Sequence, residues 1–106
     1  MSDLKFGDWV VVTHRFVRIS FDGKVFNKPN RLSTPEIGIF LGYRICNDGE
    51  EILSGCGESY TPTKYYQVAL VCTNEKENPF HAPKEKLKVV ERGFKIENPD
   101  QYYYEN

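Results

Sequence analysis

The chain has 106 residues, of which 14% are aromatic, and a formal net charge of -1. This length fits one domain that buries a core without metal or disulfide cross-links. The near-neutral charge argues against a uniformly basic nucleic-acid binder and equally against a polyanionic mimic of DNA.

The cysteines and the start of the chain bear on the cellular compartment. Cys46, Cys56 and Cys72 are odd in number and irregularly spaced, and the first residues lack the apolar stretch of a signal peptide. These features predict a reduced, cytoplasmic protein. No run approaches the ~18 apolar residues that span a bilayer, so we expect no membrane role.

The first predicted strand carries Val10 and Val12 on one face. The apolar residues that follow, from Val17 to Phe21, are odd-numbered, and this change of parity predicts a bulge near His14. The strand is therefore expected to bend as it leaves the core.

A hairpin is predicted next. Asp22-Gly23 lies between two apolar runs, which is the strongest two-residue turn signal in the chain. We expect residues 27–35 to form an irregular return loop, because prolines are excluded from helices and central strands. Residues 15–31 thus form an inserted hairpin and loop with five basic residues against one acidic residue.

The second predicted strand covers residues 36–45 and alternates strongly. The alternation predicts a core face of Ile37, Ile39, Leu41, Tyr43 and Ile45, with Phe40 and the glycines opposite.

In the rest of the chain, further strands separated by turns and loops are predicted. Asn47-Asp48-Gly49 predicts a second hairpin turn, residues 54–63 a flexible loop, and residues 64–73 a third strand. Residues 83–86 predict a single helical turn, followed by a closing strand that ends at Val90.

Three segments together resemble a known fold. They are Gly7-Asp8-Trp9-Val10-Val11-Val12, Gly38-Ile39-Phe40-Leu41-Gly42-Tyr43, and the closure from Pro83 through Leu87 to Val89-Val90. The chain is similar to Src-homology-3-like (SH3-like) barrels, especially modules of the KOW and Tudor kind. The resemblance implies an all-β protein: one SH3-like small β-barrel over residues 1–93, with the inserted hairpin at 15–31 after the first strand, and a short C-terminal tail at 94–106.

The two kinds of module imply different ligands. A KOW-like module implies RNA binding through basic residues near the first turn, here Arg15 or Arg18. A Tudor-like module implies an aromatic cage, for which Tyr43, Tyr60 and Tyr65 are the candidates. In the tail, Tyr102-Tyr103-Tyr104 is expected to be an unstructured end, with docking on the barrel or on a partner as the alternatives.

The residues that could support catalysis lack the required spacing. The cysteines and the two histidines, His14 and His81, do not form the closely spaced ligand pairs of a zinc site. Cys56 lies between two glycines on a predicted loop, but nothing in the sequence places a base beside it. We therefore predict no metal, no cofactor and no enzymatic activity.

The inserted hairpin is the predicted contact surface, because it interleaves cations with aromatic rings, a mixture found at protein interfaces and in single-stranded nucleic-acid binders. The expected function is non-enzymatic binding of another protein. By a loose likeness to small phage or mobile-element proteins, that partner would be a host enzyme acting on nucleic acid, which the protein inhibits or modulates. The alternative is direct RNA or DNA binding by the same surface. The predicted partner-binding residues are Arg15, Phe16, Arg18, Phe21, Lys24, Phe26, Lys28, Arg31 and Tyr60.

Overall fold

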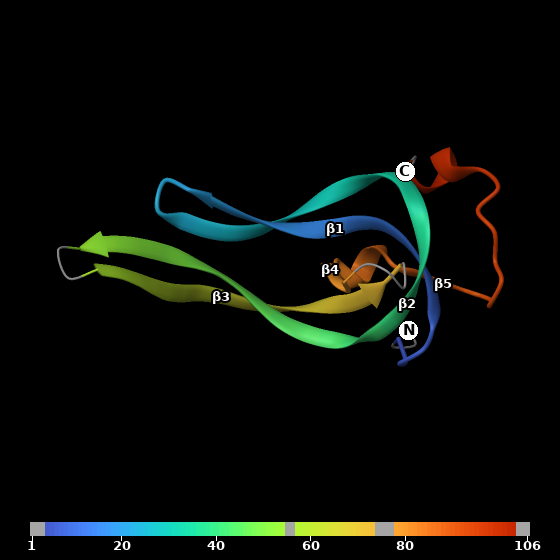
Figure 1. Ribbon diagram of the computed structural model, residues 1–106, viewed down its shortest axis with the longest axis horizontal. Coiled ribbons are helices and arrows are strands. Elements are labelled where there is room, and N and C mark those ends of the chain that lie inside the picture. Colours follow the sequence, from blue (N-terminus) through green and yellow to red (C-terminus); the bar gives the residue numbers. More distant parts are fainter. Residues whose placement is uncertain (1–3, 55–56, 74–77, 104–106) are drawn as a thin grey trace.

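The computed structural model describes residues 4–54, 57–73 and 78–103. These residues form one antiparallel sheet with the strand order β4-β3-β2-β1-β5 (Figure 1), so the prediction of an all-β protein is confirmed. The elements are β1 (Trp9–Phe21), β2 (Lys24–Ser54), β3 (Gly57–Cys72), β4 (Phe80–Ala82), the 3-10 helix η1 (Lys84–Lys86), β5 (Lys88–Val90) and the 3-10 helix η2 (Pro99–Tyr102).

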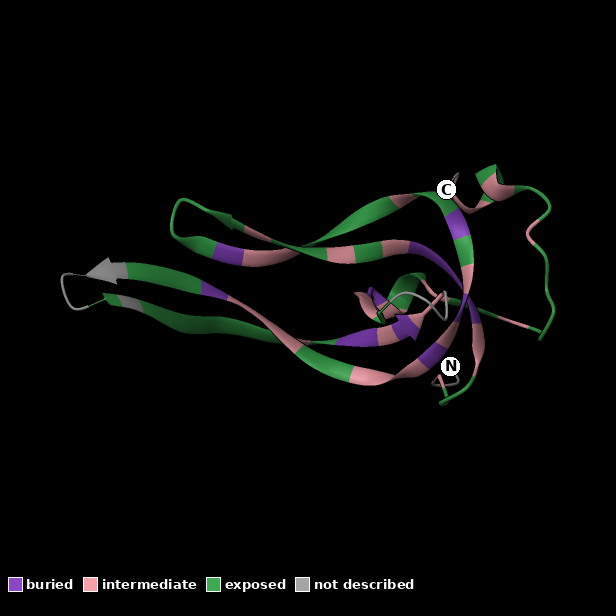
Figure 2. Ribbon diagram, viewed as in Figure 1, coloured by how far each residue is buried: buried purple, intermediate pink, exposed green. Residues whose placement is uncertain are grey.

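The molecule is elongated. It measures 55 × 31 × 27 Å, and its radius of gyration is 16.2 Å, against about 13 Å for a compact domain of this length. Figure 1 shows the cause: the β1–β2 and β2–β3 hairpins extend in the same direction, away from the region that holds β4 and β5. We call that region the body. Most of the buried residues lie in the body (Figure 2).

The course of β2 produces this shape. β2 pairs with β1 from Lys24 to Ile39 and with β3 from Ile39 to Ser54. Near its middle the strand reverses direction at the end of the molecule that holds the body (Figure 1). At Gly38 a Cβ atom would lie 3.0 Å from the carbonyl oxygen of Cys72, so a glycine permits the close approach of β3 there.

The core of the body consists of Val10, Val12, Phe40, Ala69, Val71 and Ala82. The predicted core face of the second strand was wrong, since Phe40 is 1% exposed whereas Ile45 is 66% exposed. Gly38 pairs with the buried Val10 and Phe40 pairs with the buried Val71, so the even-numbered residues face the core in this part of β2. A register shift between Phe40 and Gly42, where Gly42 has a φ of +138°, then exchanges the two faces. Ile45 is exposed because it pairs with Gln67, beyond the core residues Ala69 and Val71 of β3.

The two ends of the sheet belong to short strands. β5 pairs with β1 from Trp9 to Val11, and β4 pairs with β3 from Ala69 to Val71. The described sheet has β4 and β5 as its edges and is not closed into a barrel, so the SH3-like closure is not confirmed. The predicted helical turn and closing strand are present as η1 and β5.

Two features of the inserted hairpin are confirmed. The pairing of β1 with β2 shifts register between Val12 and His14, where the bulge was predicted. Asp22 and Gly23 form the turn, with φ angles of 52° and 75°, as a type I′ turn requires.

Three loop predictions were wrong. Asn47-Asp48-Gly49 does not form a turn, because β2 continues to Ser54 and Gly49 pairs with Pro62. The expected flexible loop belongs largely to β2 and β3. The expected return loop is part of β2, with Pro29 paired to Phe16.

Candidate functional site

The inserted basic hairpin, residues 15–31, does not stand alone. A second hairpin, formed by residues 44–54 of β2 and 57–67 of β3, lies beside it (Figure 1). At the tip of the basic hairpin, the backbone nitrogen of Glu51 donates a hydrogen bond of 2.7 Å to the carbonyl oxygen of Gly23. The Ser20 hydroxyl lies 3.5 Å from a carboxylate oxygen of Glu51. The two hairpins therefore form one arm.

A polar cluster of Asn27, Asp48 and Tyr66 joins the hairpins near the middle of the arm. One oxygen of Asp48, Oδ1, accepts hydrogen bonds from the Asn27 backbone nitrogen at 3.1 Å and from the Tyr66 hydroxyl at 2.8 Å. The Asn27 side-chain nitrogen donates to the Tyr66 hydroxyl at 2.8 Å. Burial and the hydrogen bond to Asp48 raise the pKa of Tyr66 to about 12.

Strand pairing assigns the predicted site residues to two faces of the basic hairpin, because cross-strand partners share a face and faces alternate along each strand. The inner face, toward the second hairpin, carries Phe16, Arg18, Ser20, Val25 and Asn27. The outer face carries Arg15, Val17, Ile19, Phe21, Lys24, Phe26 and Lys28.

The side chains of the inner face that are described next make their contacts within the molecule. Val25 is only 3% exposed. The Phe16 ring packs against the Tyr66 ring, with centroids 6.1 Å apart. The Arg18 guanidinium lies over the Tyr60 ring, 5.5 Å from its centroid. These residues hold the two hairpins together.

The outer face combines exposed cations with partly exposed apolar side chains. Lys24 and Lys28 are exposed. Their cross-strand partners are Phe21, which is 73% exposed, and Val17, which is 36% exposed. Phe26 is half-buried. Five of the nine predicted site residues are thus gathered on this face: Arg15, Phe21, Lys24, Phe26 and Lys28.

Two arginines at the base of the hairpin lie over aromatic rings of the body and tail. The Arg15 guanidinium is 5.0 Å from the centroid of the Phe80 ring on β4. Arg31 is 3.7 Å from the centroid of the Tyr103 ring. Stacking on a ring holds a guanidinium in place.

The three tyrosines that could form an aromatic cage do not share one site. Tyr43 packs edge-on against Phe40 in the body. Tyr60 lies beside Arg18 and its hydroxyl donates to Asn47 Oδ1. Tyr65 is 64% exposed on the second hairpin. The described part of the chain therefore offers no cage built from these residues.

The described part of the tail docks on the body. η2 places Tyr103 so that its hydroxyl donates a hydrogen bond of 2.8 Å to the carbonyl oxygen of Leu32. Tyr102 is half-buried, and the Lys88 ammonium is 5.8 Å from the centroid of its ring. The expected unstructured end was wrong for Tyr102 and Tyr103, which contact the body as the docking alternative proposed. Tyr104 lies outside the described residues.

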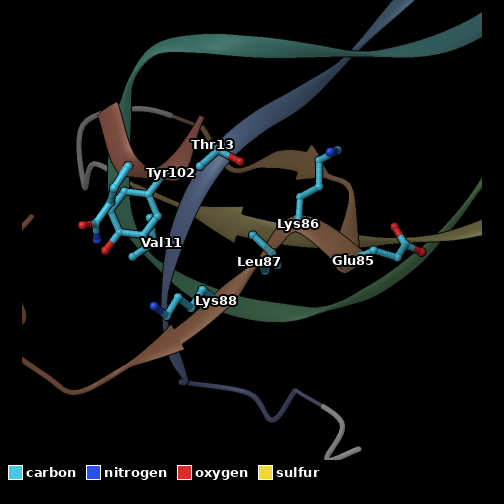
Figure 3. Close-up of a pocket in the computed structure, with 8 residues that line it drawn as sticks. Val11, Thr13, Glu85, Lys86, Leu87, Lys88 and Tyr102 are labelled. Atoms are coloured by element: carbon cyan, nitrogen blue, oxygen red, sulfur yellow. The ribbon is translucent and has the colours of Figure 1, made fainter. Parts of the chain in front are cut away.

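A hollow of about 220 Å³ lies between the tail and the body, next to their contact. Figure 3 shows it between β1, the η1–β5 segment and the tail, and its lining mixes apolar, charged and amide side chains. The lining residues are Val11, Thr13, Glu85, Lys86, Leu87, Lys88, Gln101 and Tyr102. Because the tail forms one wall, the shape of this hollow depends on tail docking.

The structure brings together one thiol and one imidazole that the sequence did not connect. The Cys46 sulfur, on β2, lies 3.7 Å from Nδ1 of His81, on β4. Burial raises the pKa of the Cys46 thiol, although the nearby Arg18 charge opposes the shift. A raised pKa keeps the sulfur protonated and so disfavours a nucleophilic role. Cys56 lies outside the described residues.

Within residues 4–54, 57–73 and 78–103, no group of three or more His, Cys, Asp or Glu side chains is arranged to hold a metal ion. A search of the same residues finds no helix whose length and apolar character would let it cross a membrane. Comparison of the chain with protein-family models, curated proteins and solved structures gave no match.

Proposed function

We propose that the protein is a non-enzymatic binding module that engages the acidic surface of another protein through the outer face of its basic hairpin. The single observation behind this proposal is the composition of that face. The exposed Lys24 lies directly across the strand pair from Phe21 and the exposed Lys28 from Val17, and the fold leaves both apolar side chains exposed. Aromatic residues and cations that surround a desolvated centre are typical of the energetically dominant part of protein interfaces.

The way in which the hairpin is held also supports this proposal. The inner face packs against the second hairpin through Val25, Phe16 and Arg18. The outer face is therefore presented by a supported two-hairpin arm, so a partner that binds it does not have to order a free hairpin.

One observation favours a protein partner over a nucleic acid. Several aromatic rings near the basic residues already pack within the molecule, as Phe16 does on Tyr66, so fewer ring faces are left for stacking bases. Direct RNA or DNA binding is the alternative that the experiment must exclude.

The finer fold assignment is also a proposal. We infer that the body is an SH3-like roll, because β5 lies beside β1, η1 directly precedes β5, and Arg15 of β1 reaches over Phe80 of β4. The likeness to phage or mobile-element proteins that modulate a host enzyme acting on nucleic acid gives a first class of partner to test.

The test begins with capture of partners from the native host by the full chain, followed by titration calorimetry with each purified candidate. We expect Phe21→Ala and the Lys24→Glu/Lys28→Glu variant each to weaken binding by about tenfold or more. The matched control is Arg92→Glu, because Arg92 is also an exposed cation but lies outside the arm.

The nucleic-acid alternative is tested with the same variants and labelled single-stranded oligonucleotides at about 50 and 200 mM salt. If affinity for the oligonucleotide falls steeply with salt and with the lysine substitutions, while no protein complex responds to Phe21→Ala, the proposed protein-binding function is wrong.

A further inference from the structure

The base of the basic hairpin holds a tyrosine of the chain's own tail. His14 and Arg31 are cross-strand partners and so share a face of β1 and β2. The Tyr103 ring lies 3.7 Å from the Arg31 guanidinium and meets the His14 ring edge-on, with centroids 6.4 Å apart. We call the site formed by His14, Arg31 and the Leu32 carbonyl the tyrosine corner.

The contacts in this corner involve both the hydroxyl group and the ring face of the tyrosine side chain. The Leu32 carbonyl oxygen accepts the hydrogen bond of the Tyr103 hydroxyl at 2.8 Å, and the guanidinium covers the ring face. Phenylalanine would satisfy the ring contact alone, and a smaller side chain would satisfy neither. Burial of the hydroxyl also raises the pKa of Tyr103, against the opposing charge of Arg31.

Charge complementarity adds to this geometry. The segment before the corner's occupant, residues 97–103, contains Glu97 and Asp100 and no basic residue. At the corner itself the basic group is Arg31, whereas Arg15 and Lys28 lie on the opposite, outer face of the hairpin. The segment that occupies the corner is therefore acidic and contains the tyrosine that binds there.

We propose that the tyrosine corner is a recognition site for a tyrosine in an acidic segment of the protein partner, and that Tyr103 occupies this site in the free protein. The proposal rests on the proposed function, because Arg31 belongs to the same basic hairpin. A partner's tyrosine takes the place of Tyr103 and so removes the tail from the hairpin base. Because the tail is covalently attached, its effective concentration at the corner is on the order of millimolar, and the intact chain binds a competing peptide weakly.

The experiment uses the full chain with Tyr103→Ala, which empties the corner without altering the residues that form it. The probe is a fluorescent peptide with the sequence of residues 97–103, followed by fluorescence anisotropy. We expect saturable binding at least about tenfold tighter to the Tyr103→Ala protein than to the wild type, because only the variant has an empty corner.

Two controls make the result specific. In the Tyr103→Ala background, adding Arg31→Ala should abolish the gain in peptide binding, whereas adding Arg92→Ala should leave it unchanged. A peptide with alanine at its last position should not bind. Circular dichroism checks that each variant retains its sheet.

The proposal is overturned if a folded Tyr103→Ala protein binds the peptide no better than the wild type does, or if Arg31→Ala leaves the gain intact. Either result would leave the proposed function standing, because the calorimetric test depends on Phe21, Lys24 and Lys28 of the outer face. Conversely, partner binding that is unchanged by Phe21→Ala and by Lys24→Glu/Lys28→Glu, together with peptide binding to the Tyr103→Ala protein, would refute the proposed function and leave peptide binding at the corner intact.

Discussion

Asn27 and Asp48 belong to the same strand, β2, yet the backbone nitrogen of Asn27 donates a hydrogen bond of 3.1 Å to Asp48 Oδ1. The contact exists because β2 reverses direction in the body, so that its two halves contribute to hairpins that lie side by side. The Asp48 carboxylate thus accepts a hydrogen bond from the basic hairpin, while the arginines of that hairpin lie over aromatic rings.

We expect Asp48→Ala to destabilise the protein by about 1–3 kcal/mol, because it removes the acceptor of two hydrogen bonds from partly buried donors. The donors are the Asn27 backbone nitrogen and the Tyr66 hydroxyl. Urea denaturation measures the free energy of unfolding. The matched control is Glu50→Ala, which removes an exposed carboxylate from the same strand and should change stability by no more than about 0.5 kcal/mol. Equal effects of the two substitutions would show that the polar cluster contributes nothing.

The polar cluster also predicts a loss of stability at high pH. The Tyr66 pKa is raised from 10.0 to about 12 in the folded protein. Between these values the unfolded chain releases the Tyr66 proton while the folded chain retains it, so the free energy of unfolding falls as pH rises through this interval. Below pH 10 the contribution is fully present.

Urea denaturation at several alkaline pH values measures this effect, with ultraviolet absorbance following tyrosine ionisation. Tyr66→Phe should show a smaller decline in stability across the same interval, since it removes the titrating group. Asp48→Ala should lower the pKa of Tyr66, because the hydrogen bond to Asp48 is one cause of the upward shift. An identical decline in the wild type and Tyr66→Phe would rule out Tyr66 as its source.

Gly49 should tolerate no side chain. A Cβ atom at Gly49 would lie 2.6 Å from both the Thr61 carbonyl oxygen and Cζ of Tyr60. Since the first of these contacts is with backbone, the second hairpin must shift, and we expect Gly49→Ala to cost about 1–3 kcal/mol. Ser59→Ala, at an exposed position of β3, is the control. Amide hydrogen exchange locates the effect. Gly49→Ala should reduce protection in the second hairpin first, and an equal loss of protection throughout the sheet would contradict the prediction.

The sequence reveals those elements that local chemistry determines. Asp22-Gly23 forms its turn because both residues accept positive φ angles. Asn47-Asp48-Gly49 has the same local signature, but there the Asp48 carboxylate binds the other hairpin and Gly49 lies under the Tyr60 ring. These contacts join residues far apart in the chain, so no local pattern reveals them.

The predicted surface shows the same limit. The Asp22-Gly23 signal correctly located the hairpin, but only strand pairing separates the outer Lys24 and Lys28 from the inner Arg18. Pro29 lies within β2 because this half of the strand pairs with β1 alone, and a strand with one free side tolerates proline. The tyrosine corner depends on the return of the tail, for which the three tyrosines offered docking only as an alternative, with nothing to identify Arg31 and Leu32 as the contacts.

The Arg18–Tyr60 contact leads to a final prediction, about how the arm should be tested. The Arg18 guanidinium lies 5.5 Å from the Tyr60 ring centroid and joins the two hairpins. A double-mutant cycle of Arg18→Ala and Tyr60→Ala should give a coupling energy of about 0.5–1 kcal/mol, typical of a partly exposed cation–π contact. The same cycle with Arg15→Ala should give no coupling to Tyr60, because Arg15 lies over Phe80 instead. Equal coupling in the two cycles would contradict the assignment of inner and outer faces.

The predicted coupling decides how binding variants are interpreted. Arg18→Ala also removes a contact between the two hairpins, so a loss of partner binding in this variant would not report on the outer face alone. A loss of binding in Lys24→Glu/Lys28→Glu would report on the outer face, where both lysines lie.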